Sequence, residues 1–503
     1  MRVKHAKRNV IYGITTYVFL MVLTFVNRKF FINILGEDMA GLQGLLLNIL
    51  SFLNLVESGV GMAIMFSLYK PFAENDRPQI KGILGLYSKI YRVSGSVLLI
   101  VGLLLSNYLG IFVKNQISLD YVQLCFIFYV LDTAMTYFFS YKTCLLYASQ
   151  NGYIISLWDF VFKFLRYTVQ IAVLFIFKSF LVFIIVQLIT NLLYYITINF
   201  IVNKKFSWIR EEKPGEVKDK DNIIKNIKAL FIHKIGSFVV FSTDNILISY
   251  FLNLRTVALF TNYNMILSFC SNFTNKIFDG INASIGNLLA EKNNGKSYEV
   301  FKRIFFFNFW MSSFICIALY NTIDSFIVIW LGEKFIIDRT VLTVLLINLY
   351  ITTMRMSVDR FKESGGLYYA DRYAPFFEVT INLVFSIILV KKMGLAGVFI
   401  GTLISNLSVV FWIKPKIVFN NVFNKSFKEY LTRYLRYLAM AVIPFLITRG
   451  MYMVVSFNHS VLSFLLNVLA NVLIINITYV VLFHKNNEFL YYKEMILKRI
   501  KKI

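Results

Sequence analysis

The feature that most constrains this chain is a series of long apolar runs that recurs from its first fifty residues to its last fifty. Each run is long enough, as a helix, to cross a hydrocarbon layer about 30 Å thick. A transmembrane barrel would instead show strands of about ten residues with alternating polarity. The pattern therefore predicts an all-α, polytopic membrane protein.

The composition agrees with this fold class. Hydrophobic residues make up 58% of the 503 residues, with 51 Phe and 30 Tyr, which is more apolar surface than a soluble core of this length needs. We expect about 14 transmembrane helices. The predicted spans are 10–33, 41–66, 86–106, 120–145, 153–177, 181–202, 229–252, 257–284, 304–321, 341–359, 374–390, 394–413, 433–452 and 461–483.

The positive charge has an uneven distribution along the chain. The net charge is +25, from 52 Lys and Arg against 27 Asp and Glu. With the N-terminus inside, about 32 of the basic residues fall in cytoplasmic loops and tails, about 7 in outward loops and about 13 within helices. This asymmetry predicts a multi-pass protein of the inner membrane with both termini in the cytoplasm. The charge therefore reflects topology and anionic membrane lipid, and we do not expect nucleic-acid binding.

Signs of enzyme chemistry are few. The cysteines lie inside predicted helices without motif spacing, so we expect no disulfide and no metal site: Cys125, Cys144, Cys270 and Cys316. Asp219-Lys220-Asp221 resembles the acidic pair of sugar transferases, but it lies in a Lys-rich connection without an α/β domain. No phosphate-binding loop is present, so the chain is not itself an ATPase. We therefore expect a transporter with no catalytic residues and no cofactor; a membrane glycosyltransferase or polymerase is the weakest alternative.

An internal repeat divides the chain. A shift of 217 residues places Leu35 on Leu252, Leu42 on Leu259 and Ala73-Glu74 on Ala290-Glu291 without a gap. The repeat predicts two lobes of six helices in the same orientation, as in transporters with parallel repeats. The expected domains are an N-terminal lobe (1–202), a basic cytoplasmic linker (203–228), a C-terminal lobe (229–413) and a two-helix tail (414–503). Gly397 and Gly401, four residues apart, would permit close helix contact.

Charged side chains inside the predicted spans are the functional candidates, because an ionised group in hydrocarbon costs about 2.5–3.5 kcal/mol on insertion scales. The candidates for binding substrate are Arg28, Lys29, Lys163, Arg166, His233, Lys234 and Arg355. The acidic candidates, with ion coupling as their role, are Glu57, Asp159, Asp244 and Asp359.

Structural interpretations of these charges stay open. Three pairs are three or four residues apart and could simply neutralise each other: Asp159 with Lys163, Lys276 with Asp279, and Arg355 with Asp359. Several cations could instead lie near helix ends and extend to the membrane surface: Arg28, Lys29, Lys163, Arg166 and Lys234. His233 and Asp244, eleven residues apart, share one helix face. Cationic groups outnumber acidic ones in the spans, roughly 13 to 8, so a central cavity would attract an anion such as a pyrophosphate rather than a cationic drug.

Three segments resemble a known family. Residues 233–266, beginning HKIGSFVVFSTDN, are similar to the polysaccharide-repeat flippases of the multidrug/oligosaccharidyl-lipid/polysaccharide exporter superfamily. Residues 35–70 resemble the first hairpin of that family, and 360–415 resemble its eleventh and twelfth helices. The likeness is strongest to the capsule and exopolysaccharide members of Gram-positive bacteria.

The resemblance implies a V-shaped fold with a cationic cavity between two six-helix lobes, as in MATE transporters. It implies a substrate of undecaprenyl pyrophosphate carrying one oligosaccharide repeat, moved to the outer leaflet by alternating access for capsule or exopolysaccharide synthesis. Coupling to H⁺ or Na⁺ is usual in the superfamily. Expected partners are the lipid-linked oligosaccharide, membrane lipid, a polysaccharide polymerase and a chain-length regulator. Two alternatives remain: a MATE-like multidrug or cation exporter, and a flippase of lipid-linked peptidoglycan precursor.

Overall fold

A computed structural model describes residues 2–54, 57–113, 117–149, 151–217, 220–221, 223–224, 243–279, 281–367, 370–454 and 460–500. All regular elements in these ranges are helices, which confirms the all-α prediction. The chain separates into two compact units, residues 1–261 and 262–503, and each is described by itself.

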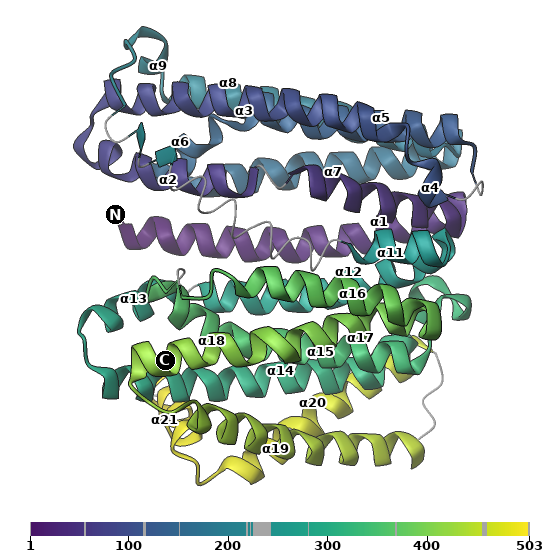
Figure 1. Ribbon diagram of the computed structural model, residues 1–503, viewed down its shortest axis with the longest axis vertical. Coiled ribbons are helices and arrows are strands. Elements are labelled where there is room, and N and C mark those ends of the chain that lie inside the picture. The colour runs from purple at the N-terminus through teal and green to yellow at the C-terminus, as the bar shows by residue number, and fades with distance from the viewer. Residues whose placement is uncertain are drawn as a thin grey trace. The chain divides into compact units, whose positions relative to one another are not determined.

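The described part of the first unit consists of long helices and short connecting ones (Figure 1). Their bounds are α1 Arg2–Leu53, α2 Glu57–Glu74, α3 Arg77–Ser106, α4 Gly110–Val113, α5 Leu119–Ser140, α6 Thr143–Ala148, α7 Gly152–Phe177, α8 Phe180–Lys205, α9 Trp208–Glu211, α11 Asp244–Phe251 and the first part of α12 Leu254–Asp279. α1 packs against α7, α3 against α5, and α8 against both α5 and α7.

The element α1 is two helical segments joined at Gly36. Gly36 has φ +87°, a left-handed value that a side-chain-bearing residue rarely adopts. In a straight helix Arg28 and Ala40 would lie about 18 Å apart along the axis. Arg28 Nη2 instead donates to Ala40 O at 3.5 Å, so the chain reverses direction between them. The kink replaces the short loop expected between the first two spans, and the second span is divided between α1 and α2.

The second unit is built around α14, the longest helix outside α1. Its elements are α13 Asn282–Ala290, α14 Asn294–Leu331, η2 Glu333–Phe335, α15 Arg339–Ser364, α16 Ala374–Met393, α17 Leu395–Ser405, η3 Asn406–Val410, α18 Phe411–Val418, η4 Phe419–Phe423, α19 Phe427–Val454, α20 Val461–Phe483 and α21 Asn487–Ile500. α14 packs against α15, α19, α20 and α21 around an aromatic core that includes Phe301, Phe305, Phe309, Tyr437 and Tyr479.

The glycine pair of the sequence lies on α17 and meets the backbone of α16. A Cβ on Gly397 would lie 2.6 Å from Val390 N, and one on Gly401 would lie 2.7 Å from Ser386 Cα. Only a hydrogen atom fits at these two positions, which confirms the expected close helix contact.

Eleven helices among the described residues are long and apolar enough to cross a membrane. The difference from the expected fourteen has identifiable sources. The first two spans share the element α1, and most of 229–252 lies outside the described residues. α12 is long enough but carries several polar amides, among them Asn262, Asn264, Asn272 and Asn275.

Candidate functional site

Among the described residues of the first unit, Arg28 is the most deeply buried cation. It lies in α1 and is 6% exposed. Its Nη1 donates to Gln43 Oε1 at 2.8 Å, and its guanidinium carbon lies 5.9 Å from the centre of the Phe31 ring. Gln43 Nε2 in turn donates to Tyr129 OH at 3.4 Å. The reversal at Gly36 thus brings a neutral amide to the buried guanidinium.

The neighbouring helix α7 adds a second cation to this region. Asn27 Nδ2 donates to Gln170 Oε1 at 3.4 Å, and the Thr24 and Tyr167 hydroxyls lie 3.0 Å apart, so these side chains join α1 to α7. Arg166 stacks on Tyr167 with 4.9 Å between guanidinium carbon and ring centre. Its charge also acts on Tyr129. Arg28, through Gln43, and Arg166 therefore both lie near Tyr129.

The other cations of this half have different surroundings. Lys29 is exposed. Lys163 Nζ lies 2.9 Å from Asp159 Oδ2, and both side chains are about one third exposed. The i,i+4 spacing that suggested an ion pair therefore does form one on α7. Glu57 begins α2, and its side chain lies outside the described set.

Asp132 has a polar environment that the sequence pattern did not identify. It is 5% exposed on α5, and its two oxygens accept hydrogen bonds from Gln187 Nε2 at 2.7 Å and Asn191 Nδ2 at 2.8 Å, both on α8. The signal that could have found the partners is the spacing of Gln187 and Asn191, four residues apart on one helix face.

The predicted helix-seven site is described only in part. His233 and Lys234 lie outside the described residues, so their shared face with Asp244 stays a prediction. Asp244 is the first residue of α11, and its Oδ1 is buried with no hydrogen-bond partner among the described residues. The adjacent Asn245 donates to Gly44 O at 3.3 Å. In the repeat alignment Asn245 corresponds to Arg28. Asn245 binds Gly44, and Arg28 binds the adjacent Gln43.

The second unit holds a charge network around Arg355. This residue is 9% exposed on α15; its Nε donates to Asp359 Oδ2 and its Nη1 to Asn406 Oδ1, both at 3.2 Å. Asp359 Oδ1 also lies 3.1 Å from Lys414 Nζ on α18. Asn406 begins the π-helical segment η3, a distortion often found at functional sites.

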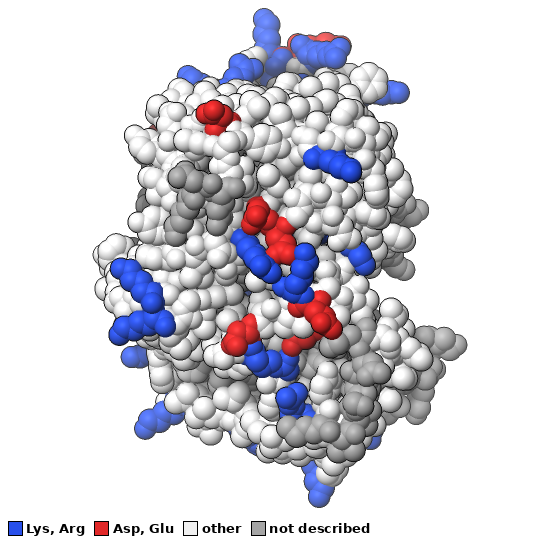
Figure 2. Space-filling view, turned by 90° about the vertical axis from the view of Figure 1, so that its right-hand side faces the viewer, with Lys and Arg blue, Asp and Glu red and all other residues white. Residues whose placement is uncertain are grey.

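Further acidic groups surround this network. Glu378, 8% exposed on α16, lies within electrostatic reach of both Arg355 and Lys414. Asp279 Oδ1 binds Arg360 Nη2 at 2.8 Å. Arg355, Arg360 and Lys414 are thus accompanied by carboxylates. Figure 2 shows one face of the molecule, on which charged side chains are few and the surface is mostly uncharged.

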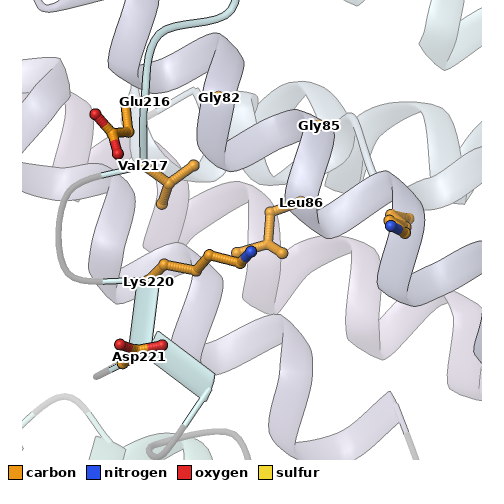
Figure 3. Close-up of a pocket in the computed structure, with 8 residues that line it drawn as sticks. Gly82, Gly85, Leu86, Glu216, Val217, Lys220 and Asp221 are labelled. Atoms are coloured by element: carbon orange, nitrogen blue, oxygen red, sulfur yellow. The ribbon is translucent and has the colours of Figure 1, made fainter.

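A pocket of about 790 Å³ lies where the basic linker meets α3. The described lining includes Glu216, Val217, Lys220 and Asp221 of the linker, and Gly82, Gly85 and Leu86 on α3. In Figure 3, Val217 and Lys220 extend toward α3, whereas the Glu216 side chain points away from it. Gly215 N donates to Pro78 O at 2.9 Å, and Gly82 leaves room for Gly215. The linker therefore contacts α3 through its backbone. Asp221 is one of the residues that line this pocket.

Among the described residues, no group of three or more His, Cys, Asp or Glu side chains is arranged to hold a metal ion. The cysteines of this part of the chain are free thiols, two of them buried.

No protein-family model and no curated protein matches the sequence. Several solved structures share its fold. The lipid II flippase MurJ, in an inward closed conformation, has a TM-score of 0.66 and 14% identity, covering 95% of this chain and 99% of that one. An inward-facing MATE-family multidrug resistance transporter of the MOP superfamily has a TM-score of 0.62 and 13% identity, covering 79% and 95%.

A third similar structure is a MOP superfamily transporter from Pyrococcus furiosus, described as having a binding pocket of reversed polarity that suggests a different function. Its TM-score is 0.57 at 13% identity, covering 80% of this chain and 92% of that one. The protein is therefore an all-α polytopic membrane protein with the fold of MOP superfamily transporters.

Proposed function

We propose that this chain is a flippase that moves an undecaprenyl-pyrophosphate-linked oligosaccharide repeat unit from the cytoplasmic to the outer leaflet of a bacterial membrane, for capsule or exopolysaccharide synthesis. The lobes 1–202 and 229–413, joined by the linker 203–228, alternate between access to each side. The tail 414–503 lies in the second compact unit, residues 262–503. No covalent chemistry is required of the protein.

The fold supports a transporter, and the extent of the match favours a lipid-linked cargo. The lipid II flippase aligns with 95% of this chain, whereas the MATE transporter aligns with 79%. A flippase of peptidoglycan precursor is the second candidate, because lipid II is the substrate named for that structure. An exporter of cationic drugs is the third.

The observation that carries the proposal is the buried guanidinium of Arg28, with Arg166 beside the same tyrosine. Arg binds phosphate oxygens through paired N–H donors, which suits a pyrophosphate. The pairing of Lys163 with Asp159 and of Arg355 with Asp359 gives these two cations less capacity for an anion. We therefore assign first contact with the pyrophosphate to Arg28 and Arg166, and supporting roles to Lys29, His233 and Lys234.

Ion coupling, where it occurs, is proposed for an acidic group inside a span. Asp159 and Asp359 are occupied by ion pairs. Asp244 has a buried oxygen without a hydrogen-bond partner among the described residues, so it is the preferred candidate over Glu57. Expected protein partners are a polysaccharide polymerase and a chain-length regulator in the same membrane.

The test uses cells that lack the chromosomal gene and carry variants on a plasmid. Arg28→Ala should stop delivery of repeat units and make the lipid-linked glycan accumulate, with membrane levels of the protein unchanged. Arg28→Lys should retain part of the activity because it keeps the charge. The matched control is Lys70→Ala, which removes an exposed cation at the end of α2. Normal delivery by Arg28→Ala would contradict the proposal. Accumulation of lipid II instead of a repeat unit would favour the second candidate.

A further inference from the structure

A cavity of about 340 Å³ lies in the second unit where the start of α14, the start of α19 and the α20–α21 connection meet. Figure 1 shows α19, α20 and α21 beside α14. Three cationic side chains of α19 line the cavity: Lys428, Arg433 and Arg436. The phenols of Tyr298 and Tyr437 also line it. The described residues that line the cavity include none of those assigned to transport.

The cavity has an excess of positive charge. Arg433 is fixed by Glu488 Oε1 at 3.0 Å and Tyr437 OH at 3.4 Å, both bonds leaving from Nη1, and its buried Nε has no hydrogen-bond partner among the described residues. Lys425 lies 3.6 Å from Glu429. Lys428 and Arg436 are exposed and have no ion-pair partner in the part of the chain that the structure describes. Four cations thus accompany two carboxylates, which leaves an excess of two positive charges.

The position of the cavity along α19 coincides with a change from charged to apolar surface. Lys428 and Arg436 are eight residues apart, about 12 Å along the helix axis. Beyond Arg436 the same helix exposes Leu438 (41%), Val442 (46%) and Leu446 (61%). This order, cations first and exposed apolar side chains next, is that of a helix entering the membrane from the headgroup region.

The helix α21 also has the features of a helix at the membrane surface. Phe489 stacks on Trp310 with ring centres 5.9 Å apart, and Arg303 lies 4.0 Å from the centre of the Tyr491 ring, so α21 is held against α14. Away from these contacts α21 exposes Met495 and Leu497 beside basic residues. A helix with exposed apolar and basic residues is typical of one that lies in the membrane interface.

We propose that this cavity binds the phosphate of an anionic membrane phospholipid whose acyl chains lie along the exposed apolar surface of α19. Arg433 forms the fixed wall, and Arg436 and Lys428 contact the phosphate oxygens. Arg is well suited to this role because its fork donates two parallel hydrogen bonds to a phosphate. A lipid is favoured over a soluble phosphate compound because the apolar surface continues directly from the cationic cavity.

The test is native mass spectrometry of the purified full-length protein, titrated with phosphatidylglycerol or with phosphatidylcholine of the same acyl chains. The test variant is Lys428→Gln with Arg436→Gln. The control variant, Arg449→Gln with Lys498→Gln, removes two cations elsewhere, one of them further along the same helix α19. We expect the test variant to bind phosphatidylglycerol roughly tenfold more weakly, a change of about 1.4 kcal/mol, and the control to bind it like the wild type.

Arg436→Lys, which keeps the charge, should stay within about threefold of the wild type, and this comparison guards against a misfolded double variant. The proposal is overturned if the test and control variants lose affinity equally, or if phosphatidylcholine binds as tightly as phosphatidylglycerol. Displacement of the lipid by millimolar inorganic phosphate would assign the cavity to a free anion and would also overturn it.

Discussion

The charged residues inside the spans differ most in what surrounds each of them. Lys163 and Arg355 each face a carboxylate four residues away on the same helix, whereas Arg28 is bound by the amide of Gln43 from a separate segment. A paired cation is stabilised in place but its field is largely cancelled.

The Arg28–Gln43 contact leads to a prediction at this scale. Gln43→Glu places a carboxylate 2.8 Å from the Arg28 guanidinium without changing side-chain size. We expect transport of the lipid-linked cargo to fall by about tenfold or more, because the new ion pair neutralises the cation. Thermal stability should be unchanged or higher. Transport is followed by delivery of repeat units, and stability by thermal unfolding of the purified protein in detergent.

The control for this prediction is Gln79→Glu, which adds the same charge at the start of α3. It should transport normally. Undiminished transport by Gln43→Glu would show that the positive charge of Arg28 has no part in handling the cargo.

At the scale of elements, buried amides join α20, a helix of the tail, to α14 within the second unit. Asn321 Nδ2 on α14 donates to Asn471 Oδ1 at 2.8 Å, and Asn467 Nδ2 on α20 donates to Asn321 O at 3.2 Å. Nearby, Tyr479 OH donates to Ser313 Oγ at 2.7 Å. Because lipid offers no competing hydrogen bonds and little apolar driving force, such bonds hold one membrane helix against another.

Removal of the central amide should loosen α20. Asn471→Leu leaves Asn321 Nδ2 without its acceptor, and we expect a loss of about 1–2 kcal/mol in the free energy of unfolding. The measurement is a lower midpoint of thermal unfolding in detergent. Leu473→Ala, on the same helix at a side chain that is 51% exposed, should change the midpoint less. Equal effects of the two substitutions would argue against the role of the amides.

The start of α15 depends on a cap whose strength varies with pH. Asp338 Oδ1 accepts a hydrogen bond from Thr340 N at 2.7 Å, and the side chain and N–H of Thr340 lower the pKa of the Asp338 carboxyl from its ordinary value. A carboxyl with a lowered pKa stabilises the folded state above its unfolded pKa, and this contribution is lost as the pH falls through the folded pKa.

The stability difference between the wild type and Asp338→Ala should therefore be present at neutral pH and shrink below about pH 4, near the ordinary pKa of Asp. Hydrogen exchange at the first turn of α15 measures it locally. Asp338→Asn, which keeps the acceptor without the charge, should show a weaker dependence on pH. A constant difference across the pH range would mean that the carboxylate does not cap α15.

At the scale of the whole molecule, local sequence patterns predicted local structure well. Apolar runs predicted the helical spans, i,i+4 spacing predicted the pairs Asp159–Lys163 and Arg355–Asp359, and a glycine pair predicted the contact of α17 with α16. These features depend on residues within one or two turns of each other. They can therefore be read without knowledge of the fold.

Contacts between separate segments were not predictable in the same way. The binding of Arg28 by Gln43 requires the reversal at Gly36, and the partners of Asp132 come from a helix more than fifty residues further along the chain. The hydrogen bond from Arg355 to Asn406 joins α15 to the π-helical segment η3, which begins about fifty residues further along the chain. Such contacts are set by tertiary packing, which helix periodicity does not contain.

The most direct measurement is flipping by the purified protein. Proteoliposomes would carry a polyprenyl-pyrophosphate-linked oligosaccharide with a fluorescent label on the glycan, and a quencher that cannot cross the membrane would report the glycans on the outer surface. The wild type should make nearly all of the label quenchable, while Arg28→Ala and protein-free liposomes should leave about half protected, since only the outer of two leaflets is reached. Label that stays half protected with the wild-type protein and a driving ion gradient would contradict a flippase of anionic, lipid-linked glycan.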